Sequence, residues 1–82
     1  MSSLAMDLKR AAIGYYRGSD SMADRFFEEA LKRRKEIDME NVKPHIKKLL
    51  QDFVNIRLTK DKQKAAEDAL MYSTLFQNSS LA

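Results

Sequence analysis

Residues 21–33 read SMADRFFEEALKR, and this run carries the clearest secondary-structure signal in the chain. Its apolar residues recur at spacings of three and four, which places their side chains on one face of an α-helix. Several acid–base pairs stand four positions apart on the opposite face, as in a solvated helix surface. Ser21 and Asp24 form a variant of the capping box. The pattern predicts a helix over residues 21–37 with Ser21 as its cap.

A second amphipathic pattern precedes this one, over residues 3–17. Its apolar stripe consists of Leu4, Leu8, Ala11, Ala12 and Tyr15. Gly18 follows the pattern and suits a left-handed cap at the end of the helix, because it lacks a Cβ atom. Gly14 lies inside the helix, where glycine costs about 1 kcal/mol relative to alanine. We therefore expect Gly14 to mark a close contact with a neighbouring helix.

The C-terminal half contains two further helical patterns after a connection at residues 37–43. Pro44 suits the first turn of a helix, where its missing N–H costs nothing, and Thr59 is a candidate cap for a following helix. The first of these patterns has the apolar stripe Ile46, Leu49, Leu50, Phe53 and Val54, and the second has Ala65, Ala69, Tyr72 and Phe76. No glycine or proline follows Pro44, so one long bent helix is the alternative, but typical helix lengths favour two.

The predicted fold is a single all-α domain over residues 1–82, a small antiparallel bundle of four helices. If the last two patterns form one helix, the bundle has three. No strand-like alternation is present. The predicted helices span about 3–17, 21–37, 44–58 and 60–77, and the tail at 78–82 should fray.

Composition argues against catalysis and against metal binding. The chain has 82 residues, no cysteine and one histidine, His45. A structural zinc site needs several histidine or cysteine ligands, and a catalytic histidine needs an orienting partner. Glycine-rich phosphate loops are also absent. We therefore expect a protein that is not an enzyme and that uses no cofactor.

Charge and hydropathy indicate a chain that does not enter a membrane. Fifteen Lys and Arg residues against twelve Asp and Glu give a net charge of +3, with the two signs interspersed. No stretch approaches the roughly 20 apolar residues of a transmembrane helix, and the N-terminus lacks the features of a secretory signal. A cytoplasmic location is the expectation.

The last helix is apolar around more of its circumference than a small bundle can cover. Ala66 and Leu70 flank its main stripe on one side, and Met71 and Leu75 flank it on the other. Tyr16 joins these candidates, because amphipathic rings are common at interfaces. The predicted function is therefore that of a protein–protein interaction module, adaptor or assembly subunit. Its partner is another protein or a second copy, as in a homodimer. Alternatively, this helix lies at the centre of the bundle and contacts all the others.

A run of basic residues supports a second hypothesis, nucleic-acid binding. The predicted patch consists of Lys32, Arg33, Arg34 and Lys35, joined across the connection by Lys43, Lys47 and Lys48. Such a patch would bind phosphates in a salt-sensitive manner. The alternative reading is a helix C-terminus enriched in cations, which complement the helix dipole.

Two short segments resemble known families. Residues 8–31 resemble one tetratricopeptide-type hairpin through the residues Leu8, Ala11, Ala12, Tyr15, Gly18, Ala23, Phe27, Ala30 and Leu31. This resemblance implies a peptide-binding scaffold, although the closing proline of that motif is absent and residues 41–77 do not repeat it. Residues 46–66, with Arg57-Leu58-Thr59-Lys60, resemble a helical segment of the GINS replication factors. That resemblance implies a replication-complex scaffold, although Asp61 departs from the pattern that follows the lysine.

Overall fold

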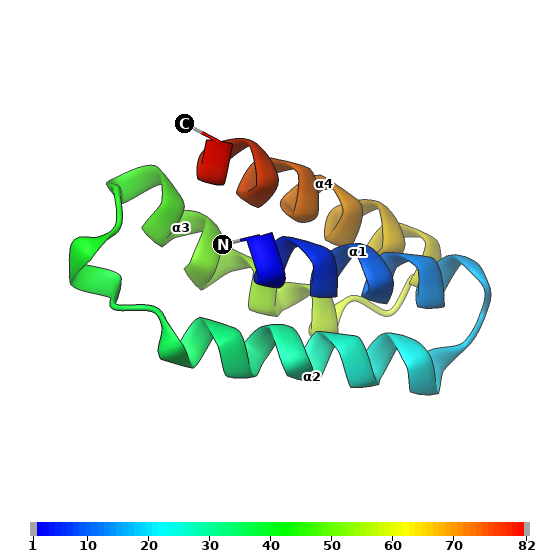
Figure 1. The fold of residues 1–82 in the computed structure, drawn as a ribbon. Coiled ribbons are helices and arrows are strands. Elements are labelled where there is room, and N and C mark those ends of the chain that lie inside the picture. The colour runs from blue at the N-terminus through cyan, green and yellow to red at the C-terminus, as the bar shows by residue number, and fades with distance from the viewer. Residues whose placement is uncertain (1, 82) are drawn as a thin grey trace.

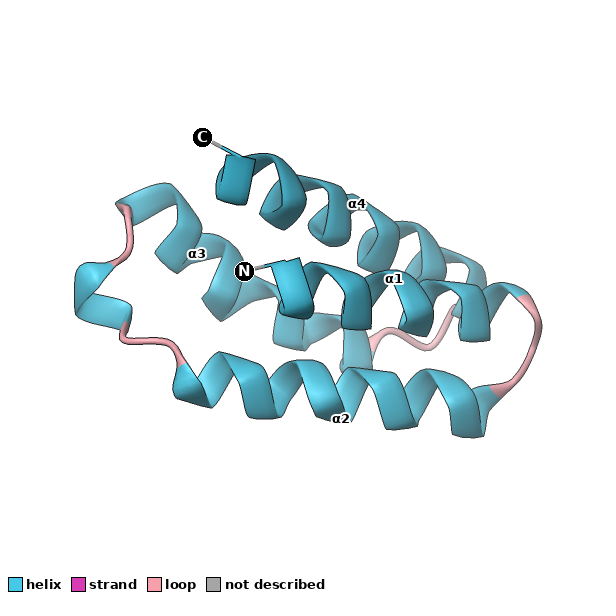
Figure 2. Ribbon diagram, in the orientation of Figure 1, coloured by secondary structure: helices cyan, strands magenta, loops and turns pink. Residues whose placement is uncertain are grey.

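A computed structural model describes residues 2–81 of the chain, and the side chains of residues 3–78. The described part contains four α-helices and two short 3-10 segments, and the rest of it is loop and turn (Figure 2). The helices are α1 (Ser2–Tyr16), α2 (Asp20–Glu36), α3 (Pro44–Asp52) and α4 (Lys62–Leu81), and the 3-10 segments are η1 (Met39–Asn41) and η2 (Phe53–Leu58).

Successive helices run in opposite directions, and α1 packs against both α2 and α4 (Figure 1). The predicted all-α bundle of four helices is confirmed. Among the described residues, no helix combines the length and apolar character needed to cross a bilayer.

The turn between α1 and α2 is set by Gly18. Its φ of 72° lies in the left-handed region, which costs glycine little because it has no Cβ. The Gly18 N–H donates to the Tyr15 carbonyl and the Ser19 N–H donates to the Gly14 carbonyl, so the end of α1 is closed as predicted. The predicted capping box at Ser21 is wrong. This tight closure lets α2 begin at once, at Asp20, so Ser21 lies inside its first turn.

The contact between α1 and α2 is close because of Gly14. A Cβ placed on Gly14 would lie 2.7 Å from the backbone nitrogen of Ala23 and 2.9 Å from its Cα. The predicted reason for a glycine inside a helix is confirmed. Along the same contact, Arg33 Nε donates to Asp7 Oδ2 over 2.7 Å, and the Asp7 carboxylate is otherwise buried.

The predicted helix over residues 44–58 is divided into α3 and η2. The 3-10 geometry of η2 places residues three apart on one side, which buries both Phe53 and Ile56. Phe53 stands between the two other core phenylalanines. Its ring centroid lies 5.9 Å from that of Phe27 on α2 and 5.9 Å from that of Phe76 on α4, both edge to face. These contacts hold the C-terminal half of the chain against the N-terminal hairpin.

A separate fourth helix is present, but its limits differ from the prediction. Thr59 is not the cap, because the Asp61 carboxylate accepts from the N–H groups of Gln63 and Lys64. At its other end α4 continues to Leu81, so the predicted end at residue 77 and the predicted frayed tail are wrong for the backbone of 78–81. That segment contains no glycine or proline to stop the helix. Residue 82 lies outside the described part.

Candidate functional site

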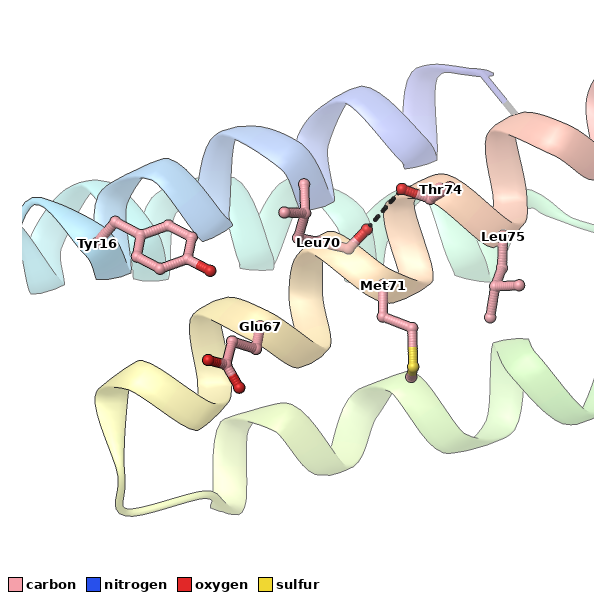
Figure 3. Close-up of a pocket in the computed structure, with 6 residues that line it drawn as sticks. All are labelled: Tyr16, Glu67, Leu70, Met71, Thr74 and Leu75. Atoms are coloured by element: carbon pink, nitrogen blue, oxygen red, sulfur yellow. Dashed lines mark hydrogen bonds between the residues drawn. The ribbon is translucent and has the colours of Figure 1, made fainter.

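The outward face of α4 forms a shallow apolar groove with the end of α1. This groove, called the α4 groove below, has a volume of about 400 Å³. It is lined by Tyr16, Glu67, Leu70, Met71, Thr74 and Leu75 (Figure 3). Tyr16 is 56% exposed, Leu70 40%, Met71 48% and Leu75 38%. Large apolar side chains exposed together in this way are typical of binding surfaces.

The sequence of α4 explains why its outward face is apolar. Asp68 is the last charged residue of the chain, and residues 69–82 contain none, although a third of all residues are charged. The side of α4 that faces the core buries Ala65, Ala69 and Phe76. The apolar residues that remain must therefore meet solvent or a partner.

One polar side chain of the groove, that of Thr74, is hydrogen-bonded within its own helix. The Thr74 hydroxyl donates to the Leu70 carbonyl over 3.0 Å, within the same helix (Figure 3). Glu67 is the charged residue of the lining, and it stands one turn before Met71. The Thr74 and Glu67 positions were missed by the sequence analysis, but their spacing of three and four from Met71, respectively, would have identified them.

Four of the five predicted apolar contact residues lie together in the α4 groove, and Ala66 does not. Ala66 is fully buried, with 0% exposure. The flank of α4 on which it lies is covered by α1, where Ser73 Oγ donates to the Ala5 carbonyl over 2.6 Å. Small residues on this side let the two backbones approach closely. Ala66 is therefore a core residue, which corrects the sequence prediction.

The alternative that the last helix occupies the centre of the bundle is also wrong. The helix with extensive contacts on two sides is α1, which packs against α2 and α4. The last helix, α4, packs mainly against α1, has smaller contacts with η2 and α3, and among the described residues has no comparable contact with α2. The stripe Leu4, Leu8, Ala11, Ala12 and Tyr15 is fully or almost fully buried. One side of α4 remains uncovered, as the interaction hypothesis requires.

The predicted basic patch is divided by structural contacts. Arg33 is bound to Asp7, and Arg34 Nε donates to the Leu50 carbonyl over 2.6 Å, near the end of α3. Lys32 lies 3.6 Å from Glu29. The other cations of the predicted patch are exposed and lie on different elements, with Lys35 on α2, Lys43 before α3, and Lys47 and Lys48 on α3. The two guanidinium groups therefore join helices to one another, and nucleic-acid binding by these seven residues stays a prediction.

Away from the α4 groove, two tyrosines have raised pKa values. Burial raises the pKa of Tyr15, and the Asp24 carboxylate raises it further. Burial likewise raises the pKa of Tyr72, with a further contribution from Asp52 and Asp68. His45 is exposed on the first turn of α3. Among the described residues, no three histidine or acidic side chains are grouped so that they could hold a metal ion.

Comparison with known proteins adds no family to this geometry. No protein-family model, no curated protein and no solved structure matches the chain. The tetratricopeptide and GINS resemblances therefore gain no support, and the α4 groove is the feature on which a functional proposal rests.

Proposed function

We propose that this protein is a helical interaction module that binds a polypeptide partner through the α4 groove. The observation that carries the proposal is the joint exposure of Tyr16, Leu70, Met71 and Leu75 around one hollow. Desolvating large apolar side chains is the main favourable term in most protein association. A non-catalytic role fits a site whose lining contains a single ionisable carboxylate, Glu67, and one phenol, Tyr16.

The groove has the composition of a protein-binding surface. A tyrosine and a methionine are enriched residue types in interfaces, and lysine and glutamate are depleted. The methionine side chain is flexible and adapts to irregular partner surfaces. Lys9, Gln77 and Asn78 line a polar hollow beside the groove, which shares Leu70 and Thr74 with it. The apolar centre therefore has a polar edge.

The proposal is tested by comparing three tagged forms of the protein as baits in a cell extract. Met71→Lys places a charge in the groove. Leu58→Lys is the matched control, because Leu58 is also an exposed apolar residue, at 80%, but lies outside the groove lining. The expected result is that specific proteins, including untagged copies of this chain, bind the wild type and the control but not Met71→Lys. If all three baits retain the same proteins, the α4 groove is not the binding site.

A further inference from the structure

We propose that the occupant of the α4 groove is a second copy of this chain, paired antiparallel through α4 about a two-fold axis. This inference rests on the proposed function, because it names the partner of the same groove. The distribution of charge along α4, the spacing of its outward side chains and the area of the groove support it.

Charge along α4 is confined to the first part of the helix. Lys62, Lys64, Glu67 and Asp68 are its charged residues, and residues 69–81 carry no charge. A parallel pair would place each of these charges level with the same charge on the second copy. An antiparallel pair instead sets the charged part of each helix against the neutral part of the other. It also brings Lys64 toward the C-terminal carbonyls of the second copy, where a cation is favoured.

The outward positions of α4 have the spacing of a helix-pairing seam. Residues 67, 71, 74 and 78 are all exposed and follow one another at intervals of four, three and four. An antiparallel register that sets Met71 level with Thr74 of the second copy also sets Glu67 level with Asn78 of the second copy. The amide of Asn78 is then a hydrogen-bond donor for the Glu67 carboxylate. Because the pairing is two-fold, each of these contacts occurs twice.

The same register places the leucines at the edges of the seam. Leu70 precedes Met71 and Leu75 follows Thr74, so they lie on opposite sides of the line through the outward positions. In the pair they would exclude water from the contact between Met71 and Thr74. The pairing therefore uses the apolar residues of the α4 groove and leaves no like charges level with each other.

The available area predicts a weak dimer. A specific pair of standard size buries about 800 Å² on each partner, of which about 450 Å² is apolar. The exposed parts of Tyr16, Leu70, Met71 and Leu75 supply roughly 350 Å², if a fully exposed side chain of this size presents about 200 Å². The methylene groups of Lys64 and Glu67 supply part of the difference. An interface at the lower end of this class corresponds to dissociation constants in the micromolar range, at about 1–100 µM.

Sedimentation equilibrium over about 1–500 µM protein tests the pairing, because this range brackets the expected dissociation constant. The wild type is expected to approach twice the chain mass of 9.5 kDa as its concentration rises. Met71→Lys should weaken the dimer by about 100-fold, because a cation replaces an apolar side chain at the centre of the seam and must be desolvated there on both copies. Leu58→Lys should dimerise like the wild type. Circular dichroism verifies that both variants fold, which is expected because both positions are exposed.

Disulfide trapping tests the antiparallel register. The natural chain has no cysteine, so the double variant Glu67→Cys with Asn78→Cys contains the two introduced thiols alone. Eleven residues of helix separate these positions by about 16 Å, which is too far for a bond within one chain. The expected result is a covalent dimer from the double variant and none from either single variant. Rapid linking of the Glu67→Cys single variant would instead show a parallel pair and overturn the register.

The outcomes separate this inference from the proposed function. If the wild type stays a monomer over the whole range, the second copy is not the occupant. The proposed function still holds in that case if Met71→Lys abolishes the capture of other proteins. If the wild type dimerises but Met71→Lys dimerises equally well, the dimer does not use the α4 groove, and the inference is wrong.

Discussion

Replacing Gly14 by alanine tests the close contact between α1 and α2. The added Cβ would lie 2.7 Å from the Ala23 nitrogen and 2.9 Å from the Ala23 Cα. Both of these are backbone atoms, so no side chain can rotate away to make room. The two helices must separate by about 1 Å to restore an ordinary contact of roughly 3.7 Å.

Two opposing terms determine the size of the effect. Alanine is better than glycine inside a helix by about 1 kcal/mol. Overpacking a rigid contact costs about 1–3 kcal/mol, and a gap of 0.5–1 Å between the helices forfeits a quarter to a half of the dispersion energy of the atoms along it. That contact includes the buried residues Phe27 and Ala30 of α2, and opening it also stretches the bond between Arg33 and Asp7. We expect a net destabilisation of about 1–2 kcal/mol, because the packing terms together exceed the helix preference.

Urea unfolding followed by circular dichroism measures this change. With an m-value of about 1 kcal/mol/M for so small a protein, the midpoint should fall by about 1–2 M. Ala23→Gly in the Gly14→Ala background should give little rescue, because it removes the Ala23 Cβ at 3.1 Å but leaves the two nearer backbone atoms in place. If Gly14→Ala instead raises the midpoint by about 1 M, the helix preference alone decides the outcome. The contact between α1 and α2 would then be loose, against our reasoning.

Three further substitutions probe other contacts of the fold. Arg33→Met leaves the buried Asp7 carboxylate without its partner and should lower the free energy of unfolding by about 2–3 kcal/mol, as measured in urea. A decrease below about 0.5 kcal/mol would show that water replaces the guanidinium. Asp61→Ala removes the acceptor for two N–H groups of α4 and should cost about 1 kcal/mol, with faster amide exchange in the first turn as its signature. Because burial raises the pKa of Tyr15 above 10.0, the folded state favours the neutral phenol. The neutral Tyr15 phenol therefore contributes its full stabilisation below pH 10.0, and this contribution is lost as the pH rises through the pKa of the folded state. Phenylalanine does not ionise, so Tyr15→Phe should lose less stability than the wild type between about pH 9 and pH 11.

Much of the fold could be predicted because the apolar periodicity matches the core. Every residue of the stripe Leu4, Leu8, Ala11, Ala12 and Tyr15 is buried. The helix limits were harder to predict, because they depend on competing hydrogen bonds. Asp61 caps α4 instead of Thr59, since its carboxylate reaches two N–H groups. Likewise, the division of α3 from η2 depends on the tertiary packing of Phe53 and Ile56, which local sequence does not encode.

Part of the candidate site could also be predicted from the apolar periodicity. A helical pattern identifies which residues share a face, and it placed Leu70, Met71 and Leu75 outside the main stripe. It does not identify which neighbouring helix covers a flank, so Ala66 was assigned to the surface although α1 covers it. The sequence also did not reveal which groups two arginines of the basic run contact. Arg33 and Arg34 are long enough to reach Asp7 and the Leu50 carbonyl, and no local pattern reveals such distant acceptors.

Methionine oxidation measures most directly whether a polypeptide covers the outward face of α4. Met6 and Met71 are almost equally exposed, at 47% and 48%, and only Met71 lines the α4 groove. Hydrogen peroxide oxidises accessible methionine to the sulfoxide, and mass spectrometry follows both residues in one sample. We expect Met6 and Met71 to be oxidised at equal rates in dilute purified protein. In concentrated protein or in a cell extract, oxidation of Met71 alone should be several-fold slower. Equal rates at Met6 and Met71 under all these conditions would contradict a binding role for the α4 groove.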